Sequence, residues 1–89
     1  MSHAIESWHT YMVRCRNGNL YTGIAKDVQH RVDRHSTGRG SKAVKAFGLP
    51  VLLVWAQEYA SHKLAAAEER RVKKLTKEQK ERMLKGDLL

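Results

Sequence analysis

Strand-forming residues fill two short stretches near the start of the chain, residues 8–15 and 20–25. The segment between them contains Asn17-Gly18, and an Asn-Gly pair flanked by apolar runs is the strongest short-range signal for a β-hairpin. The two stretches are therefore predicted to pair as antiparallel strands.

The length of the hairpin loop decides which side chains share a face of the sheet. A two-residue loop pairs Tyr11 with Ile24 and places Tyr11 and Tyr21 on opposite faces. A three-residue loop, with Gly18 as a left-handed bulge, pairs Val13 with Tyr21 and places both tyrosines on one face. The apolar pattern alone does not choose between the two registers.

Two helices are predicted next, because capping residues precede residues with helical spacing. Asp27 is a good N-cap for a helix over residues 28–37, which Gly38 ends. Ser41 caps a shorter helix that runs to Phe47.

The apolar run at residues 51–56 predicts a third strand. Because these residues are apolar at every position, we expect a central strand that is buried on both faces. The strand is predicted to continue to about Tyr59.

Two more helices complete the pattern. Ser61 caps a helix over residues 62–75, and Thr76 and Gln79 have the spacing of a capping box for a last helix that ends before Gly86. The predicted order is β-β-α-α-β-α-α. It indicates an α+β fold, similar to an α/β sandwich, in which helices flank a three-stranded, mainly antiparallel sheet.

Composition narrows the function classes. The chain has 89 residues, 42% of them hydrophobic, and a formal net charge of +8 at pH 7. We assign residues 8–86 to a single domain and residues 1–7 to a flexible lead-in. Such a basic surface attracts polyanions, and nucleic acid is the first candidate. One cysteine, Cys15, excludes an internal disulfide framework, and no apolar run is long enough for a membrane span, so we expect a cytoplasmic protein with no membrane partner.

The basic excess is concentrated in one part of the chain. Residues 14–45 hold eight Lys or Arg against two Asp, a net charge of +6, whereas residues 62–89 carry +4. We therefore expect nucleic acid to bind around the hairpin, the first helix and the Gly-rich loop. The residues expected to contact it are Arg14, Lys26, Arg34, Arg39, Lys42 and Lys45.

Two pairs of residues are candidates for chemistry. Arg31 and His35 are four apart and share a helix face, where an arginine suits a phosphate and a histidine can move a proton. A solvated helix face explains the same pair without function. Glu68 and Glu69 both lie beside the apolar stripe of a predicted helix, and spacing does not separate them. Either carboxylate could bind a metal ion, and Glu69 could instead turn outward and pair with Lys73.

Taken together, these positions resemble the GIY-YIG nuclease family, specifically its small stand-alone bacterial members. The resemblance covers most of the chain, from about Trp8 to Leu84. The family's two name-giving motifs correspond to His9-Thr10-Tyr11 (the first motif) and Tyr21-Thr22-Gly23 (the second motif). The other segments that carry the resemblance are Asp27–His35, the loop Gly38–Lys42 and Ala65–Lys77. In the last segment, alignment with the family favours Glu69 over Glu68.

The resemblance implies a divalent-metal-dependent endonuclease of low sequence specificity. It assigns Glu69 to a single Mg²⁺ (or Mn²⁺) ion and Arg31 to the phosphoryl charge. Tyr21, assisted by His35 or Tyr11, would orient and deprotonate the attacking water. Both tyrosines must then share a face, which predicts the three-residue hairpin loop.

The chain also departs from the family pattern. His9 stands where the first motif has glycine, Ile24 stands where some relatives have lysine, and no asparagine follows Glu69. The alternatives are therefore a nucleic-acid-binding module with weak or no catalysis, and a domain that binds an acidic protein partner. DNA is favoured over RNA as the nucleic acid, and the pathway is left open among repair, recombination and defence.

Overall fold

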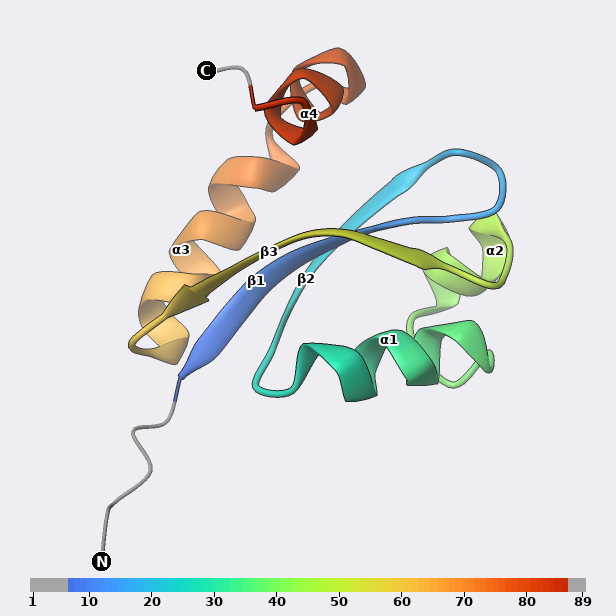
Figure 1. Cartoon of the computed structure of the whole chain (residues 1–89), viewed down its shortest axis with the longest axis horizontal. Helices are drawn as coiled ribbons and strands as arrows, with labels where there is room; N and C mark the ends of the chain where they lie inside the picture. Colours follow the sequence, from blue (N-terminus) through green and yellow to red (C-terminus); the bar gives the residue numbers. More distant parts are fainter. Residues whose placement is uncertain (1–6, 87–89) are drawn as a thin grey trace, which may run out of the picture.

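The computed structural model describes residues 7–86 and has the predicted element order (Figure 1). In chain order the elements are β1 (Trp8–Arg14), β2 (Leu20–Ala25), α1 (Val28–Ser36), α2 (Lys42–Phe47), β3 (Leu52–Tyr59), α3 (His62–Lys73) and α4 (Lys77–Leu84). The α+β fold with a three-stranded antiparallel sheet is confirmed. The lead-in predicted at residues 1–7 lies, apart from Ser7, outside the described residues.

The hairpin has the three-residue loop. Val13 pairs with Tyr21 and Tyr11 with Gly23, so both tyrosines lie on the same face of the sheet. Gly18 has a φ of 90°, and the Cys15 N–H donates to the Asn19 carbonyl across the loop. Glycine is required at the bulge because a left-handed backbone is costly for other residues.

The expectation that residues 51–56 form a central strand is wrong. The strand order is β2-β1-β3, so β1 is central and β3 lies at an edge. Leu52 is 65% exposed and Leu53 36% exposed. A run of apolar residues shows that a strand can be buried, but not whether a neighbouring strand lies on its outer side.

Helices cover both faces of the sheet (Figure 1). On one face, Tyr11 and Val13 of β1 pack in a cluster with Val32 of α1 and Val44 of α2. On the other face, the Thr10 hydroxyl donates to the Ala65 carbonyl of α3 over 2.8 Å. The sheet therefore separates two helical layers, α1 with α2 and α3 with α4.

The predicted caps are confirmed. Asp27, Ser41 and Ser61 each accept a hydrogen bond from a backbone N–H in the first turn of α1, α2 and α3. Thr76 and Gln79 form the reciprocal capping box of α4. Across residues 7–86, none of these helices combines the length and the apolar character of a membrane span.

Candidate active site

Tyr11 and His35 meet in the core between the sheet and α1. Tyr11 is fully buried, His35 is 2% exposed, and Tyr11 Oη lies 2.8 Å from His35 Nε2. Gly23 is the partner of Tyr11 on β2, and a Cβ added to Gly23 would lie 2.7 Å from Tyr11 Oη. The second motif needs its glycine at this point because the tyrosine ring passes directly against the β2 backbone.

The loop after α1 fixes the imidazole of His35. The Ser41 N–H points to His35 Nδ1 at 3.4 Å, and a side chain at Gly40 would collide with the same nitrogen. With Nδ1 as acceptor, the ring proton lies on Nε2, and His35 donates to Tyr11 Oη. Burial, and then the charges of two arginines on α1, lower the pKa of His35, so the ring is neutral near pH 7.

Tyr11 is held as a phenol. Burial first and the charge of Tyr21 second raise the pKa of Tyr11 above its ordinary value, Arg31 opposes them, and the charge of Glu69 adds the smallest increase. Tyr11 is therefore a poor proton acceptor and supports the groups around it. The effect of Glu69 shows that a carboxylate of α3 acts on Tyr11 although α3 lies on the other side of the sheet.

A pocket of about 300 Å³ lies beside the Tyr11–His35 pair. The Tyr21 ring meets the His35 ring edge-on, with centroids 5.3 Å apart. The pocket is lined by Tyr21, Arg31, Arg34, His35, Arg39, Gly40 and Ser41. Three arginines and no acid in this lining make the pocket suitable for an anion such as a phosphodiester.

Glu68 is engaged elsewhere in the fold. Its carboxylate accepts two hydrogen bonds from Arg71, at 2.6 and 2.8 Å. That hydrogen bonding, with a smaller contribution from Tyr59, lowers the pKa of Glu68. Because Tyr59 belongs to β3, Glu68 lies on the β3 side of α3.

Glu69 lies on the other side of the same helix. Ala65 and Val72 are buried against the sheet, and successive helical residues are about 100° apart around the axis, so Glu69 lies on the β2 side. Its side chain is 21% exposed and pairs with Lys73 at 3.3 Å. The two glutamates therefore lie on opposite sides of α3, and of the two only Glu69 has a charge that acts on Tyr11.

The donor set fits a lightly coordinated divalent ion. No group of three or more His, Cys, Asp or Glu capable of holding a metal occurs among residues 7–86. Glu69 therefore offers one carboxylate, and Mg²⁺ is commonly bound through one or two carboxylates together with substrate phosphates and water. The Lys73 ammonium that faces Glu69 is more than half exposed, so this ion pair is weak and can exchange for a metal ion.

Two of the six basic residues expected to contact nucleic acid line the pocket. Arg34 and Arg39 are both exposed there, and Arg34 donates to the Arg39 carbonyl over 3.3 Å. Lys42 and Lys45 are exposed on α2, outside the pocket lining. These two lysines extend the positive charge beyond the pocket.

The structure does not bring the other two basic residues to the pocket. Arg14 lies on the α4 face, where it makes a bidentate pair with Glu81, both distances being 2.7 Å. Lys26 follows β2, with its ammonium 5.3 Å from the centre of the Trp8 ring. For Arg14, a carboxylate already occupies the two donors that a phosphate would need.

The sequence did not single out Gly40 and Ser41 as supports of the site. The Gly38–Lys42 loop was expected to contact phosphate, whereas the structure shows that Gly40 and Ser41 also fix His35. The only signal in the sequence was a glycine placed five residues after a helix histidine, and that spacing is common.

Comparisons with known proteins agree with this geometry. The family model described as the GIY-YIG catalytic domain matches residues 7–82. A UPF0213 protein of Cronobacter sakazakii is 40% identical over 84 residues, which cover 94% of this chain and 87% of that protein. The UPF0213 protein YhbQ of Escherichia coli is 42% identical over 77 residues, or 86% of this chain and 76% of YhbQ.

Solved structures agree as well. The solution structure of the UPF0213 protein BH0048 from Bacillus halodurans has a TM-score of 0.58 and 30% identity, covering 89% of this chain and 83% of that one. The solution structure of EF2693 from E. faecalis has a TM-score of 0.60 and 28% identity, covering 90% of this chain and 84% of that one.

Proposed function

Because the chain belongs to the GIY-YIG family, we propose that it is a divalent-metal-dependent endonuclease that hydrolyses phosphodiester bonds, with DNA as its favoured substrate. One observation carries the proposal. Tyr21, Arg31 and His35 line a single arginine-rich pocket beside the buried Tyr11–His35 pair, and the charge of Glu69 has a small effect on Tyr11 from the opposite layer.

The arginines bind the substrate and stabilise developing charge. Arg31, Arg34 and Arg39 present guanidinium groups to one pocket, and a guanidinium matches the geometry of two phosphate oxygens. Of the three, Arg31 is the arginine whose charge acts on both Tyr11 and His35, so we assign it to offset charge on the phosphorus oxygens in the transition state.

Tyr21 is the tyrosine placed to act on the attacking water. It lines the pocket, whereas Tyr11 is fully buried. In the proposed step, Tyr21 orients the water and accepts its proton while its own hydroxyl proton passes to solvent. The water oxygen bonds to phosphorus, the bond to the leaving oxygen breaks, and that oxygen takes up a proton from solvent. Tyr11 and His35 are proposed as positioning residues, because they hydrogen-bond to each other in the core and the His35 ring packs edge-on against Tyr21.

Glu69 would hold the metal ion. A bound divalent ion would polarise the phosphoryl group and stabilise the leaving oxygen. Glu69 is suited to this because it is half-buried, lies on the β2 side of α3 and is paired only with an exposed lysine. The low number of protein ligands predicts weak metal binding before the substrate contributes its phosphate oxygens.

The test is cleavage of a panel of substrates by matched variants. Supercoiled plasmid, flapped and branched DNA, single-stranded DNA and RNA would be incubated with Mg²⁺ or Mn²⁺. Arg31→Ala and Glu69→Ala are expected to reduce cutting by at least about 100-fold, as loss of a transition-state contact does. Glu68→Gln and Arg70→Ala are the matched controls, since Glu68 faces β3 and Arg70 is exposed on α3. Equal activity in all four variants would refute the site.

A second candidate function is nucleic-acid binding without catalysis. The observation that favours it is the ion pair of Glu69 with Lys73, which gives the carboxylate a partner in the absence of metal. If the protein binds the panel in a salt-sensitive manner but cuts none of it under either metal, this second function replaces the first.

A further inference from the structure

A second, smaller pocket lies near the hairpin, between β2, α2 and α4. It has a volume of about 130 Å³ and is lined by Asn19, Leu20, Phe47, Lys77 and Lys80. Two of these side chains are apolar, one is an amide and two are ammonium groups. We call this the lysine pocket. A lining that combines apolar side chains with cationic and amide donors suits a phosphate attached to a sugar.

The charge in the lysine pocket is not balanced by acids. Lys80 is half-buried, and burial, followed by the charge of Lys73, lowers its pKa. Among residues 7–86 no carboxylate pairs with the Lys80 ammonium. Lys77 is exposed, and its charge acts on Glu81, which is already bound by Arg14. An anion in the pocket would therefore relieve the repulsion between cations and the cost of burying Lys80.

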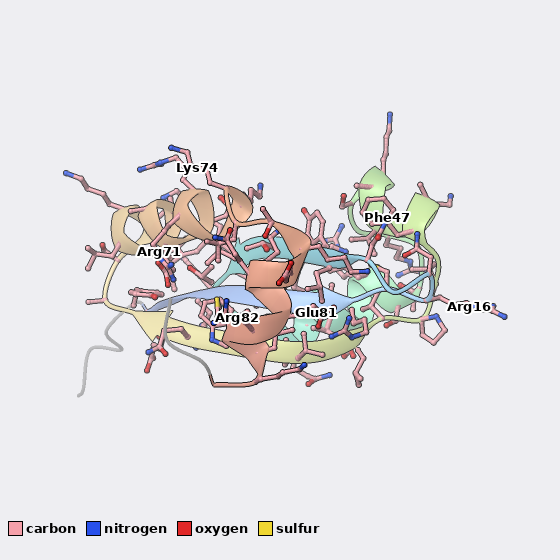
Figure 2. The ribbon with its side chains drawn as sticks, turned by 90° about the horizontal axis from the view of Figure 1, so that it is seen from above. Arg16, Phe47, Arg71, Lys74, Glu81 and Arg82 are labelled. Carbon is pink, nitrogen blue, oxygen red and sulfur yellow. The ribbon has the colours of Figure 1, made fainter. Side chains whose placement is uncertain are left out.

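The lysine pocket adjoins the candidate active site along the chain and in space. Leu20 lines the lysine pocket, and the next residue, Tyr21, lines the active-site pocket. Their side chains leave opposite faces of β2, whose outer edge is unpaired among the described strands. Figure 2 shows Phe47 of α2 and Lys74 at the end of α3 on the β2 side of the sheet, away from β3. The two pockets thus flank one exposed edge.

The acid that the proposed function assigns to the metal lies between the two sets of cations. Glu69 pairs with Lys73, and the charge of Lys73 acts in turn on Lys80. The charge of Glu69 thus acts on Tyr11 beside the arginine pocket and, through Lys73, adjoins the lysine pocket. A polyanion bound in both pockets would meet cations in each and one carboxylate, Glu69, between them.

We propose that the lysine pocket is a second phosphate-binding site, which holds the backbone of the same nucleic-acid strand next to the phosphate in the arginine pocket. Lys77 and Lys80 would bind the phosphate oxygens, and the Asn19 amide would donate to them. The inference rests on the proposed function for the identity of the ligand as nucleic acid, but it does not require that the strand be cut.

The experiment measures binding apart from cleavage. Fluorescence anisotropy of a labelled DNA duplex in EDTA, over a range of salt concentrations, gives the slope of log Kd against log salt. The variant Lys77→Gln/Lys80→Gln is compared with Lys63→Gln/Arg70→Gln, which removes the same charge from exposed positions on the side of α3 that faces away from the sheet. Circular dichroism checks that both variants are folded.

Loss of two phosphate contacts is expected to reduce the magnitude of the slope by about 1.8, equivalent to about 60-fold weaker binding at 0.1 M salt if binding at 1 M salt is unchanged. The control variant should weaken binding by less than about threefold, because its charges are exposed and screened. Equal loss in both variants would overturn the proposal. The proposal would also be overturned if a nucleoside monophosphate displaced the labelled duplex as well as unlabelled oligonucleotide does at the same phosphate concentration. The pocket would then be assigned to free nucleotides.

The two proposals fail separately. If wild-type protein shows the lysine-dependent slope but no metal supports cutting, the nuclease proposal is wrong and the lysine pocket stands. If Arg31→Ala abolishes cutting while the lysine variant binds like its control, the nuclease stands and the lysine pocket is wrong.

Discussion

Substituting Gly23 by alanine tests whether the buried Tyr11–His35 hydrogen bond depends on the glycine of the second motif. The new Cβ would lie 2.7 Å from Tyr11 Oη and 2.9 Å from Cζ, whereas heavy atoms in contact are normally about 3.5–4.0 Å apart. The hydroxyl must therefore move by close to 1 Å. Since Oη is 2.8 Å from His35 Nε2, such a movement breaks the hydrogen bond.

The cost has two parts. Overpacking a core costs about 1–3 kcal/mol, and an unsatisfied buried donor costs about 1–3 kcal/mol more. We expect a total of about 2–6 kcal/mol, a large share of the roughly 4–13 kcal/mol that a chain of this length has at about 0.05–0.15 kcal/mol per residue. The backbone itself adds no strain, because the positive φ values fall on other glycines.

Urea denaturation of a double-mutant cycle measures this cost. Gly23→Ala should lower the midpoint by roughly 2 M at a typical m-value of about 1.5 kcal/mol/M. In a Tyr11→Phe background the hydroxyl is gone, so the same substitution should cost at least about 1 kcal/mol less. An equal cost in both backgrounds, or a cost below about 0.5 kcal/mol in wild type, would refute the reasoning.

Three further predictions concern pH, a salt bridge and the sheet edge. Because the folded-state pKa of His35 is lowered, its stabilising contribution is complete above about pH 6.5 and is lost as the pH falls through the lower folded value. His35→Gln should flatten this part of a curve of unfolding free energy against pH. Equal slopes for wild type and variant would contradict the assignment. Arg14→Gln should lower the unfolding midpoint and show coupling in a double-mutant cycle with Glu81→Gln, while the salt dependence of DNA binding changes little. A decrease of about one in the slope of log Kd against log salt would show that Arg14 contacts a phosphate after all. Leu52→Lys on β3 should change stability by less than about 0.5 kcal/mol and reduce self-association in light scattering; a large loss of stability would show that Leu52 is buried in solution.

Local signals were sufficient for the positions of the helices and the hairpin. Asn17-Gly18 marked the turn, and Asp27 and Ser61 marked helix starts, because a cap or a turn acts within a few residues. The register required more: only the need for two tyrosines on one face selected the three-residue loop. The edge position of β3 could not be predicted, since it depends on which strand lies beside it.

The site was predictable only where its parts lie close in sequence. Arg31 and His35 share a helix, so spacing identified them, although spacing did not show that His35 is buried. Glu68 and Glu69 became distinguishable only when β3 placed Tyr59 against Glu68. Arg14 was counted among the nucleic-acid contacts because its partner, Glu81, is 67 residues away and no local rule connects them.

Under the proposed function, the two helical layers divide substrate binding from catalysis. The arginines belong to α1 and its following loop, whereas Glu69 belongs to α3, which is anchored by Ala65, Val72 and the Thr10 hydrogen bond. A local opening that released α3 alone would remove the proposed metal-binding carboxylate and leave the arginine pocket intact. Such a partly unfolded molecule would still bind DNA without cutting it, so cleavage would be confined to molecules in which α3 is docked on the sheet.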